Sequence, residues 1–500
     1  MDLGKLEVKI GVKSGWIQMG FGGGDRLGNE TQAVTIDEIQ QKLEGIDDAV
    51  NKKMIVSGEN VSILYFSSLV DHLRFHETVI VPLFNGHGDL TQVSEEVKPA
   101  NLHTILTLIT TGHTILFFPE RNLYLKVNTY SPPMGAIEES DTESTIAGPR
   151  NSFTEAMQTN ISLIKRRIHN SGLKSDEYRI GLETNTKATV LYMEHLVNKN
   201  NLEKVVQRLL SIRTTGINDI NELSQLMEES QFSPFPQFHN TERPDSVATS
   251  LLDGRIIILL DNSQTALICP SSFFEFFTSP EDQYSRWPTA TLLRCIRFFG
   301  FFLTIMLTPF YISALSHHPE MLPFEVLINL QESRSRVPFP PVIEVLFMEI
   351  VIEVLREAGS RMPTKIGQTI GIVGGIVIGT AAVEAGLVSN TLIVLVAISA
   401  LLSFLPPSFV MSNTSRIIRY IFILSAGLFG LYGQMIAFAW LIHHLITLTS
   451  NGTPYMAPVI PRKWTDLLDG VFRAPLTLSQ HRKGISGEVE NKTLPMDGEE

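Results

Sequence analysis

Residues 291–315, TLLRCIRFFGFFLTIMLTPFYISAL, form the apolar run that divides this chain into two unlike parts. A helix needs about 20 apolar residues to cross the hydrocarbon core of a membrane, and this run is long enough. Charged residues are spread along positions 1–285, whereas apolar runs dominate from Thr291 to Ile446. The sequence therefore predicts a water-soluble part followed by a membrane part.

Three further apolar runs follow, at 366–386, 391–407 and 417–446. Two prolines end the second of these, and the third is long enough to cross a membrane with some tilt. Four runs in one chain make a soluble protein very unlikely. The predicted fold class is an α/β cytoplasmic region of two subdomains, followed by an all-α polytopic membrane domain of about four spans plus interfacial or re-entrant helices.

Residues 340–359, PPVIEVLFMEIVIEVLREAG, are a fifth apolar segment, but they also carry Glu344. Three more carboxylates share one helix face because they are spaced i, i+4: Glu349, Glu353 and Glu357. Four carboxylates are too many for a helix that faces lipid. One interpretation is an amphipathic helix that lies at the interface or packs inside the bundle, with its acidic face in contact with water. The other is a carboxylate-lined helix that faces an aqueous cavity.

The distribution of basic residues bears on topology. The first 45 residues contain no signal segment, and Arg294 and Arg297 precede the first span, so the N-terminal half is expected in the cytoplasm. Four spans would also place the basic C-terminal segment in the cytoplasm, whereas five would place it outside. We prefer four spans with one or two interfacial or re-entrant helices.

Residues 367–386, GQTIGIVGGIVIGTAAVEAG, combine a glycine ladder with one carboxylate, Glu384. Glycine recurs every fourth residue, at Gly367, Gly371, Gly375 and Gly379. A phosphate-binding loop does not fit, because no strand precedes the segment and no Lys-Ser/Thr pair follows it. A close-packed helix face is the default interpretation. In a ring of subunits the same helix could also line a pore, with polar rings from Gln368, Thr369, Thr380 or Glu384.

The soluble part shows the patterning of two α/β units. In the first, strands are predicted near 60–66, 114–118 and 122–128, with a helix near 102–111. In the second, a helix is predicted to begin at a Ser152–Glu155 capping box and to end at Gly172, and a hairpin turns at Asp261 and Asn262. The second unit is also predicted to contain strands near 179–183 and 187–193 and helices near 201–213 and 219–230.

The predicted domains are a disordered tail (1–45), cytoplasmic α/β subdomain 1 (46–130), a linker (131–148), cytoplasmic α/β subdomain 2 (149–285), a transmembrane domain (286–450) and a C-terminal cytoplasmic segment (451–500) that is disordered after about 479.

Several function classes find no support in the sequence. The net charge of −12 comes without a basic patch, so no nucleic-acid partner is expected. Two cysteines exclude a disulfide framework. There is no G-x-S-x-G, Walker loop or C-x-x-C, and SHHPEMLP (316–323) lacks zinc-ligand spacing, so we expect no enzyme, cofactor or metal site. TERPD (241–245) is interpreted as a helix-entry turn.

Several stretches, in the same order, resemble the A subunit of the GerA-type spore germination receptors from about residue 60 to about residue 477. They are GPRNSFTEAMQTNISLIKRRI, SPFPQFHNTERPD, SPEDQYSRWPTATLLR, HHPEMLPFEVL, VPFPPVIEVLFMEIVIEVLREAG, PTKIGQTIGIVGGIVIGTAAVEAGLVS and GTPYMAPVIP. The glycine-rich N-terminal tail and the acidic end MDGEE depart from the shared pattern.

The resemblance implies a two-part cytoplasmic region, a multi-pass membrane domain and residence in the spore inner membrane. It implies two partners, a B subunit of the amino-acid-transporter type and a C-subunit lipoprotein. It also implies a homo-oligomeric ring that acts as a ligand-gated cation channel, and it brings no catalytic residues. On this hypothesis the closed gate is apolar and includes Ile372, Val373, Ile376 and Val377. The alternative is a non-conducting scaffold or signalling subunit that couples a transporter-like partner to downstream germination machinery.

Overall fold

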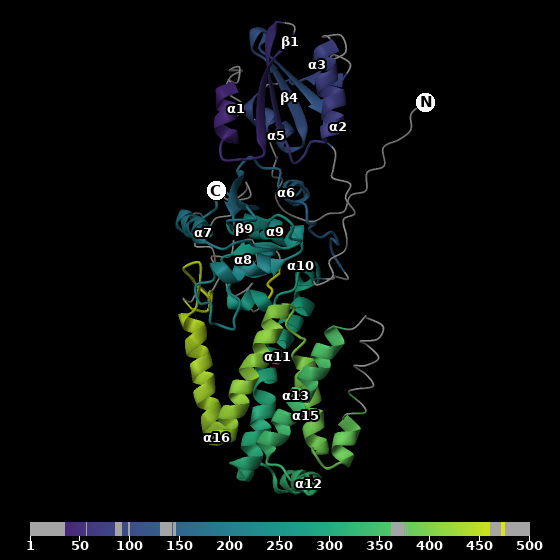
Figure 1. Ribbon diagram of the computed structural model, residues 1–500, viewed down its shortest axis with the longest axis vertical. Coiled ribbons are helices and arrows are strands. Elements are labelled where there is room, and N and C mark those ends of the chain that lie inside the picture. The colour runs from purple at the N-terminus through teal and green to yellow at the C-terminus, as the bar shows by residue number, and fades with distance from the viewer. Residues whose placement is uncertain are drawn as a thin grey trace, which may run out of the picture.

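The computed structural model describes residues 36–56, 58–85, 93–98, 101–130, 143, 147–361, 375, 377, 379–460 and 472–475. They form three tiers along the long axis of the molecule: subdomain 1 (36–130), subdomain 2 (147–284) and a helical bundle (287–447) (Figure 1). The two subdomains are built on mixed α/β layers and the bundle on helices alone. This is the two-part α/β plus all-α division that the composition predicts.

Subdomain 1 is built on an antiparallel sheet that has five strands in the described residues, in the order β1-β2-β4-β5-β3. Helices cover both faces, so β2 and β4 are apolar along most of their length. The strands are β1 (Ala49–Val56), β2 (Glu59–Phe66), β3 (Ser94–Glu96), β4 (His113–Phe118) and β5 (Leu123–Asn128). The helices are α1 (Ile36–Leu43), α2 (His72–Phe75), a π-helical turn (His76–Ile80), α3 (Val81–Asn85) and α5 (Leu102–Thr110).

Subdomain 2 repeats this topology, with the strand order β6-β7-β9-β10-β8. In both subdomains a helix precedes two strands that form a hairpin. The last two strands in the chain then lie between the second hairpin strand and the short third strand. The strands are β6 (Leu173–Ile180), β7 (Thr186–Met193), β8 (His239–Thr241), β9 (Ile256–Leu260) and β10 (Ala266–Cys269). The helices are α6 (Met157–Lys165), α7 (Lys199–Ser211), α8 (Ile220–Met227) and α9 (Pro244–Leu252). The repeat has no counterpart in the sequence analysis.

The two subdomains are joined by more than the chain between them. Residues 45–47 pair with β6 through a parallel bridge from Ile46 to Ser175, in which Asp47 N donates to Ser175 O at 3.1 Å. Lys165 of α6 and Asp48 form a buried ion pair at 2.5 Å. The two subdomains therefore contact each other directly, through backbone hydrogen bonds and a buried ion pair.

The helical bundle begins where a 3₁₀ turn (Phe273–Phe277) and α10 (Glu281–Tyr284) lead into α11 (Trp287–Ser316). At the far end lie a short 3₁₀ turn (Pro319–Met321) and α12 (Phe324–Arg334) (Figure 1). α13 (Pro341–Ser360), α15 (Asn390–Leu402) and α16 (Phe409–Thr447) pack with α11 around a core that includes Ile312, Met348, Val396 and Ile423. A short β11–β12 ribbon, Thr449–Ser450 with Thr453–Pro454, follows.

Two helices in the described part of the chain, α11 and α16, are long and apolar enough to cross a membrane. The predicted run 391–407 forms the shorter apolar helix α15, and most of the run 366–386 lies outside the described residues. The count of four spans therefore stays a prediction.

α16 folds back on itself at Gly430, where φ is 60° and ψ is −138°. Thr414 donates to Pro234 O, and His444 lies 2.8 Å from the hydroxyl of Ser233. In a straight helix Thr414 and His444 would be about 45 Å apart, so they could not contact neighbouring residues. The single tilted span predicted for 417–446 is therefore wrong, and the segment forms two limbs joined at a glycine (Figure 1).

The structure corrects three further local predictions. α1 lies within the tail predicted to be disordered, and it buries Ile39 and Leu43 in the core of subdomain 1. The Ser152 capping box does not form, since α6 begins at Met157 after Ala156 without a side-chain cap. Instead, the side chain of Asn160 bonds to the backbone of Thr154. α6 also ends at Lys165, well before Gly172.

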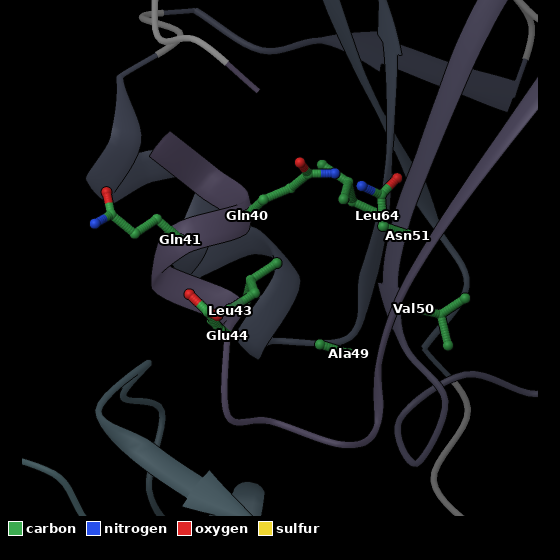
Figure 2. Close-up of a pocket in the computed structure, with 8 residues that line it drawn as sticks. All are labelled: Gln40, Gln41, Leu43, Glu44, Ala49, Val50, Asn51 and Leu64. Atoms are coloured by element: carbon green, nitrogen blue, oxygen red, sulfur yellow. The ribbon is translucent and has the colours of Figure 1, made fainter. Parts of the chain in front are cut away.

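A groove of about 440 Å³ lies between α1 and the first two strands of subdomain 1, with Gln40 reaching from the helix toward Asn51 (Figure 2). Its lining is Gln40, Gln41, Leu43, Glu44, Ala49, Val50, Asn51 and Leu64. These side chains offer amides and one carboxylate but no nucleophile–base pair, so the groove gives no reason to assign catalysis.

Candidate functional site

The carboxylates of α13 lie in a column of ion pairs that runs through the bundle. At its far end, the fully buried Glu344 accepts from Arg334 Nε at 3.1 Å and from the backbone N–H of Ser389 at 2.6 Å. Ser389 caps α15, and its hydroxyl lies 3.2 Å from the hydroxyl of Tyr311 on α11. Glu344 thus ties together α12, α13 and the start of α15.

In the middle of the column both members of the ion pair are buried. Glu349 of α13 lies 3.2 Å from Arg419 of α16 and accepts from the hydroxyl of Thr308 at 3.3 Å. Arg419 also donates to Ser399 Oγ on α15 at 2.7 Å. All four side chains are buried, so one carboxylate and one guanidinium join α11, α13, α15 and α16.

The column becomes more exposed toward subdomain 2. Glu353 pairs with Arg416 of α16 and with Arg356 on its own helix. Glu357 pairs with Arg361 at 2.5 Å, and both side chains are more than half exposed. Burial of the carboxylates therefore falls along α13 from Glu344 to Glu357.

These contacts correct the prediction for residues 340–359. The helix is packed inside the bundle, as one interpretation allowed, but Glu344 and Glu349 are neither wet nor facing a cavity. From the sequence, the arginines after position 400 were expected to bear only on topology, and their role as ion-pair partners was not predicted. A signal was available: Arg416 and Arg419, spaced i, i+3 on an apolar helix, lie about one helical turn apart, as do Glu349 and Glu353, which are spaced i, i+4.

The described part of the glycine segment lies at the outer edge of the bundle. Residues 379–384 are helical, and Ala382 packs into the bundle core. A side chain added at Gly375 or at Gly379 would meet no atom within 4 Å. The glycine face therefore has no packing partner among the described residues of this chain.

The predicted pore residues fall into two groups. Gln368, Ile372, Val373 and Ile376, together with Gly367 and Gly371, lie outside the described residues. Val377, Thr380 and Glu384 are described, and all three are exposed.

The histidines near the ends of the bundle have packing roles. An added side chain at Gly430 would lie 2.7 Å from His317 Cβ, so the turn between the limbs of α16 fits against His317. His444 stacks on Trp440 and bonds to Ser233. Within the described ranges, no group of three His, Cys, Asp or Glu side chains could hold a metal ion.

A comparison with known families agrees with the order of motifs. A family model described as the Bacillus/Clostridium GerA spore germination protein matches residues 37–485. The chain belongs to the GerA family. The resemblance inferred from the sequence motifs is thereby confirmed over nearly the whole chain.

The GerA relatives include two named germination proteins of similar length. Spore germination protein GerQA of Bacillus cereus is 38% identical over 451 residues, covering 89% of this chain and 90% of that protein. Spore germination protein A1 of Bacillus subtilis is 37% identical and covers 91% and 95%. The crystal structure of the N-terminal domain of the A subunit of the Bacillus megaterium germinant receptor GerK3 aligns at 23% identity with a TM-score of 0.36, covering 48% of this chain and 94% of that domain.

Proposed function

We propose that this chain is the membrane subunit of a nutrient germinant receptor that triggers endospore germination, and that its copies assemble into a ligand-gated cation channel in the spore inner membrane. Its partners would be a transporter-like B subunit and a C-subunit lipoprotein. Membership of the GerA family supports the germination role. The observation that carries the oligomeric channel is the glycine face at Gly375 and Gly379, where an added side-chain carbon would meet no atom of the described residues within 4 Å.

The glycine face suits contact between copies. Small residues spaced four apart let helix backbones approach closely in lipid, where packing rather than the hydrophobic effect drives association. Val377, two residues from both Gly375 and Gly379, points to another side of the same helix. One side could therefore pack on a neighbouring copy while the other faces the axis of the ring.

The two ends of the bundle support an even number of membrane crossings. α11 starts beside subdomain 2, where Arg294 and Arg297 both bond to Asp282 of α10. The chain returns there after α16, since Ser450 donates to Gln237 O and Tyr455 donates to Pro236 O. An even count favours the four-span over the five-span topology and leaves both ends in the cytoplasm. Glu384, repeated around the ring, would then favour cations.

Replacing Gly379 by leucine is expected to leave each chain folded and to break the ring. A Cβ at position 379 would meet no atom of the described residues within 4 Å, and leucine is the better helix former. Light scattering in nanodiscs should show a lower mass with an unchanged unfolding temperature. The matched control is Gly427→Leu, where an added carbon would lie 2.8 Å from Val342 Cγ2 and the unfolding temperature should fall. A Gly379→Leu chain of wild-type mass would contradict the proposed interface.

Replacing Val377 by asparagine is expected to give a constitutive ion leak, because a polar ring would hold water in a gate that apolar side chains keep dry. The measurement is potassium efflux from liposomes that contain the purified chain, where the variant should leak several-fold faster than the wild type. A variant that is folded, oligomeric and electrically silent would contradict a gate at this position.

The alternative is a non-conducting scaffold or signalling subunit. The bundle interior supports this alternative. Each of the four α13 carboxylates is ion-paired, and none of the described contacts indicates a water-filled path through a single chain. Liposomes separate the two: flux through the purified oligomer supports the channel, and inserted but impermeable oligomers support the scaffold.

A further inference from the structure

The loop Gln231–Phe235 of subdomain 2 lies between the two ends of the α16 hairpin. Ser233 bonds to His444 in the last turn of the second limb, and Pro234 O accepts from Thr414 near the start of the first limb. Phe235 is buried, with its ring 5.9 Å from that of His444 and 6.1 Å from that of Phe273. The loop is therefore held at the level where both limbs end.

Phe232, inside this loop, points fully away from the protein. Its side chain is 103% exposed, the largest exposure of any described apolar side chain. Leaving a phenylalanine in water rather than burying it is unfavourable, because its apolar surface stays hydrated. The loop is held on either side of Phe232, since Gln237 bonds to the backbone of Ser230 and Ser233 bonds to His444. The Phe232 ring is not covered by the described residues, so we look for a second surface that would cover it.

The level of the loop matches the boundary between lipid and water. The first limb of α16, from Phe409 to the break at Gly430, rises about 30 Å, which is the thickness of a hydrocarbon core. Its ends therefore lie near the two head-group regions. Trp440, partly exposed and stacked on His444 with ring centroids 5.7 Å apart, is the kind of aromatic residue found at that boundary.

The surroundings of Phe232 remove the main electrostatic obstacle to lipid contact. Of the two nearby carboxylates, Glu229 pairs with Arg208 at 2.7 Å and Glu228 accepts from the backbone N–H of Gln237. The remaining neighbours, Ser230 and Gln231, are uncharged. Each of the two carboxylates therefore already has a partner within the protein, and only that of Glu229 is an arginine.

We propose that Phe232 inserts into the head-group region of the lipid bilayer on the side of subdomain 2. This contact anchors subdomain 2 to lipid directly, in addition to its attachment through α11 and α16. The inference rests on the membrane insertion of α16, which is part of the proposed function, and not on channel activity.

The test places a fluorophore at position 232 in the full-length chain. Phe232→Cys is labelled with the environment-sensitive dye NBD in a Cys295→Ser background. Cys269 is buried in β10, and burial raises the pKa of its thiol, so it should not react. The labelled chain is reconstituted in phosphatidylcholine vesicles. Quenching is then compared between lipid brominated near the head group and iodide in the water.

Two matched positions calibrate the result. Ile55→Cys lies on an exposed position at the end of β1 remote from subdomain 2, and Leu424→Cys lies on an exposed position of the first limb of α16. The label at 232 should be quenched several-fold more by bromolipid than by iodide, and the label at 55 should show the reverse. The label at 424 should resist iodide.

Each contrary outcome has its own meaning. A label at 232 that iodide quenches as strongly as at 55 would place the loop in water and overturn the proposal. Protection from both quenchers would mean that protein, such as a second copy, covers Phe232, which also overturns it. If iodide also reached position 424, the bundle itself would be outside lipid, and the membrane insertion in the proposed function would fail with it.

Discussion

Replacing Arg419 by methionine is expected to remove most of the folded protein. The change leaves the carboxylate of Glu349 buried among α11, α13, α15 and α16 with one weak partner, the hydroxyl of Thr308. Removing one member of a buried ion pair typically costs about 3–5 kcal/mol, which is a large part of the stability of an ordinary domain. The loss should appear as a lower unfolding temperature and a lower yield of monodisperse protein in detergent.

A double variant and a surface variant make this prediction specific. Glu349→Leu with Arg419→Met removes both charges, and replacing a whole buried pair by apolar residues is often neutral or stabilising. It should recover most of the lost unfolding temperature. Arg361→Met breaks the exposed pair with Glu357 and should change stability by less than about 1 kcal/mol. If Arg419→Met behaved like Arg361→Met, the buried pair would have no structural role.

Replacing Lys165 by methionine is expected to uncouple the two subdomains. The ammonium of Lys165 lies 2.5 Å from Asp48 Oδ1 and 3.8 Å from the centre of the Phe66 ring, so it joins α6 to subdomain 1. Asp48 would keep only the hydroxyl of Ser68 as a side-chain partner among its described contacts. An unpaired carboxylate at a buried interface costs about 3–5 kcal/mol, and separation of the subdomains would relieve that cost.

Calorimetry of the full chain checks this second prediction. The thermal transitions of the two subdomains should separate in Lys165→Met and merge again in Asp48→Leu with Lys165→Met. Glu95→Gln, which breaks the exposed pair with Lys126 on the same sheet, should leave the trace unchanged. Coincident transitions in Lys165→Met would show that the backbone pairing of Ile46 with Ser175 is sufficient to hold the interface.

The strands that the sequence predicts well lie inside the sheets. β2, β4, β5 and β7 are found at or within one residue of the predicted positions, as is the β9–β10 hairpin with its turn after Leu260. The first strand of each sheet was predicted less well from the sequence. β1 was not predicted, and β6 begins six residues before its predicted start. Both are edge strands with polar residues, such as Lys52 and Glu177, which hide the alternation that marks a strand.

The candidate site divides in a similar way. The sequence identified the carboxylates of α13 as costly in a membrane helix, because charge and hydropathy belong to each residue wherever it lies. It could not show that Arg419 meets Glu349, because that contact joins positions 70 residues apart on two helices whose mutual orientation depends on all the packing between them. The same holds for the turn at Gly430, because the contacts of the two limbs with Ser233 and Pro234 join positions far apart in the chain.

The sequence by itself determined the division into an α/β part and an apolar helical part and the family, because both follow from residue types and their order along the chain. Only the tertiary structure decided that the carboxylates of α13 are paired with arginines, that α16 returns to subdomain 2, and that the glycine face has no packing partner among the described residues. Those features depend on distances between residues far apart in the chain, and only packing sets such distances.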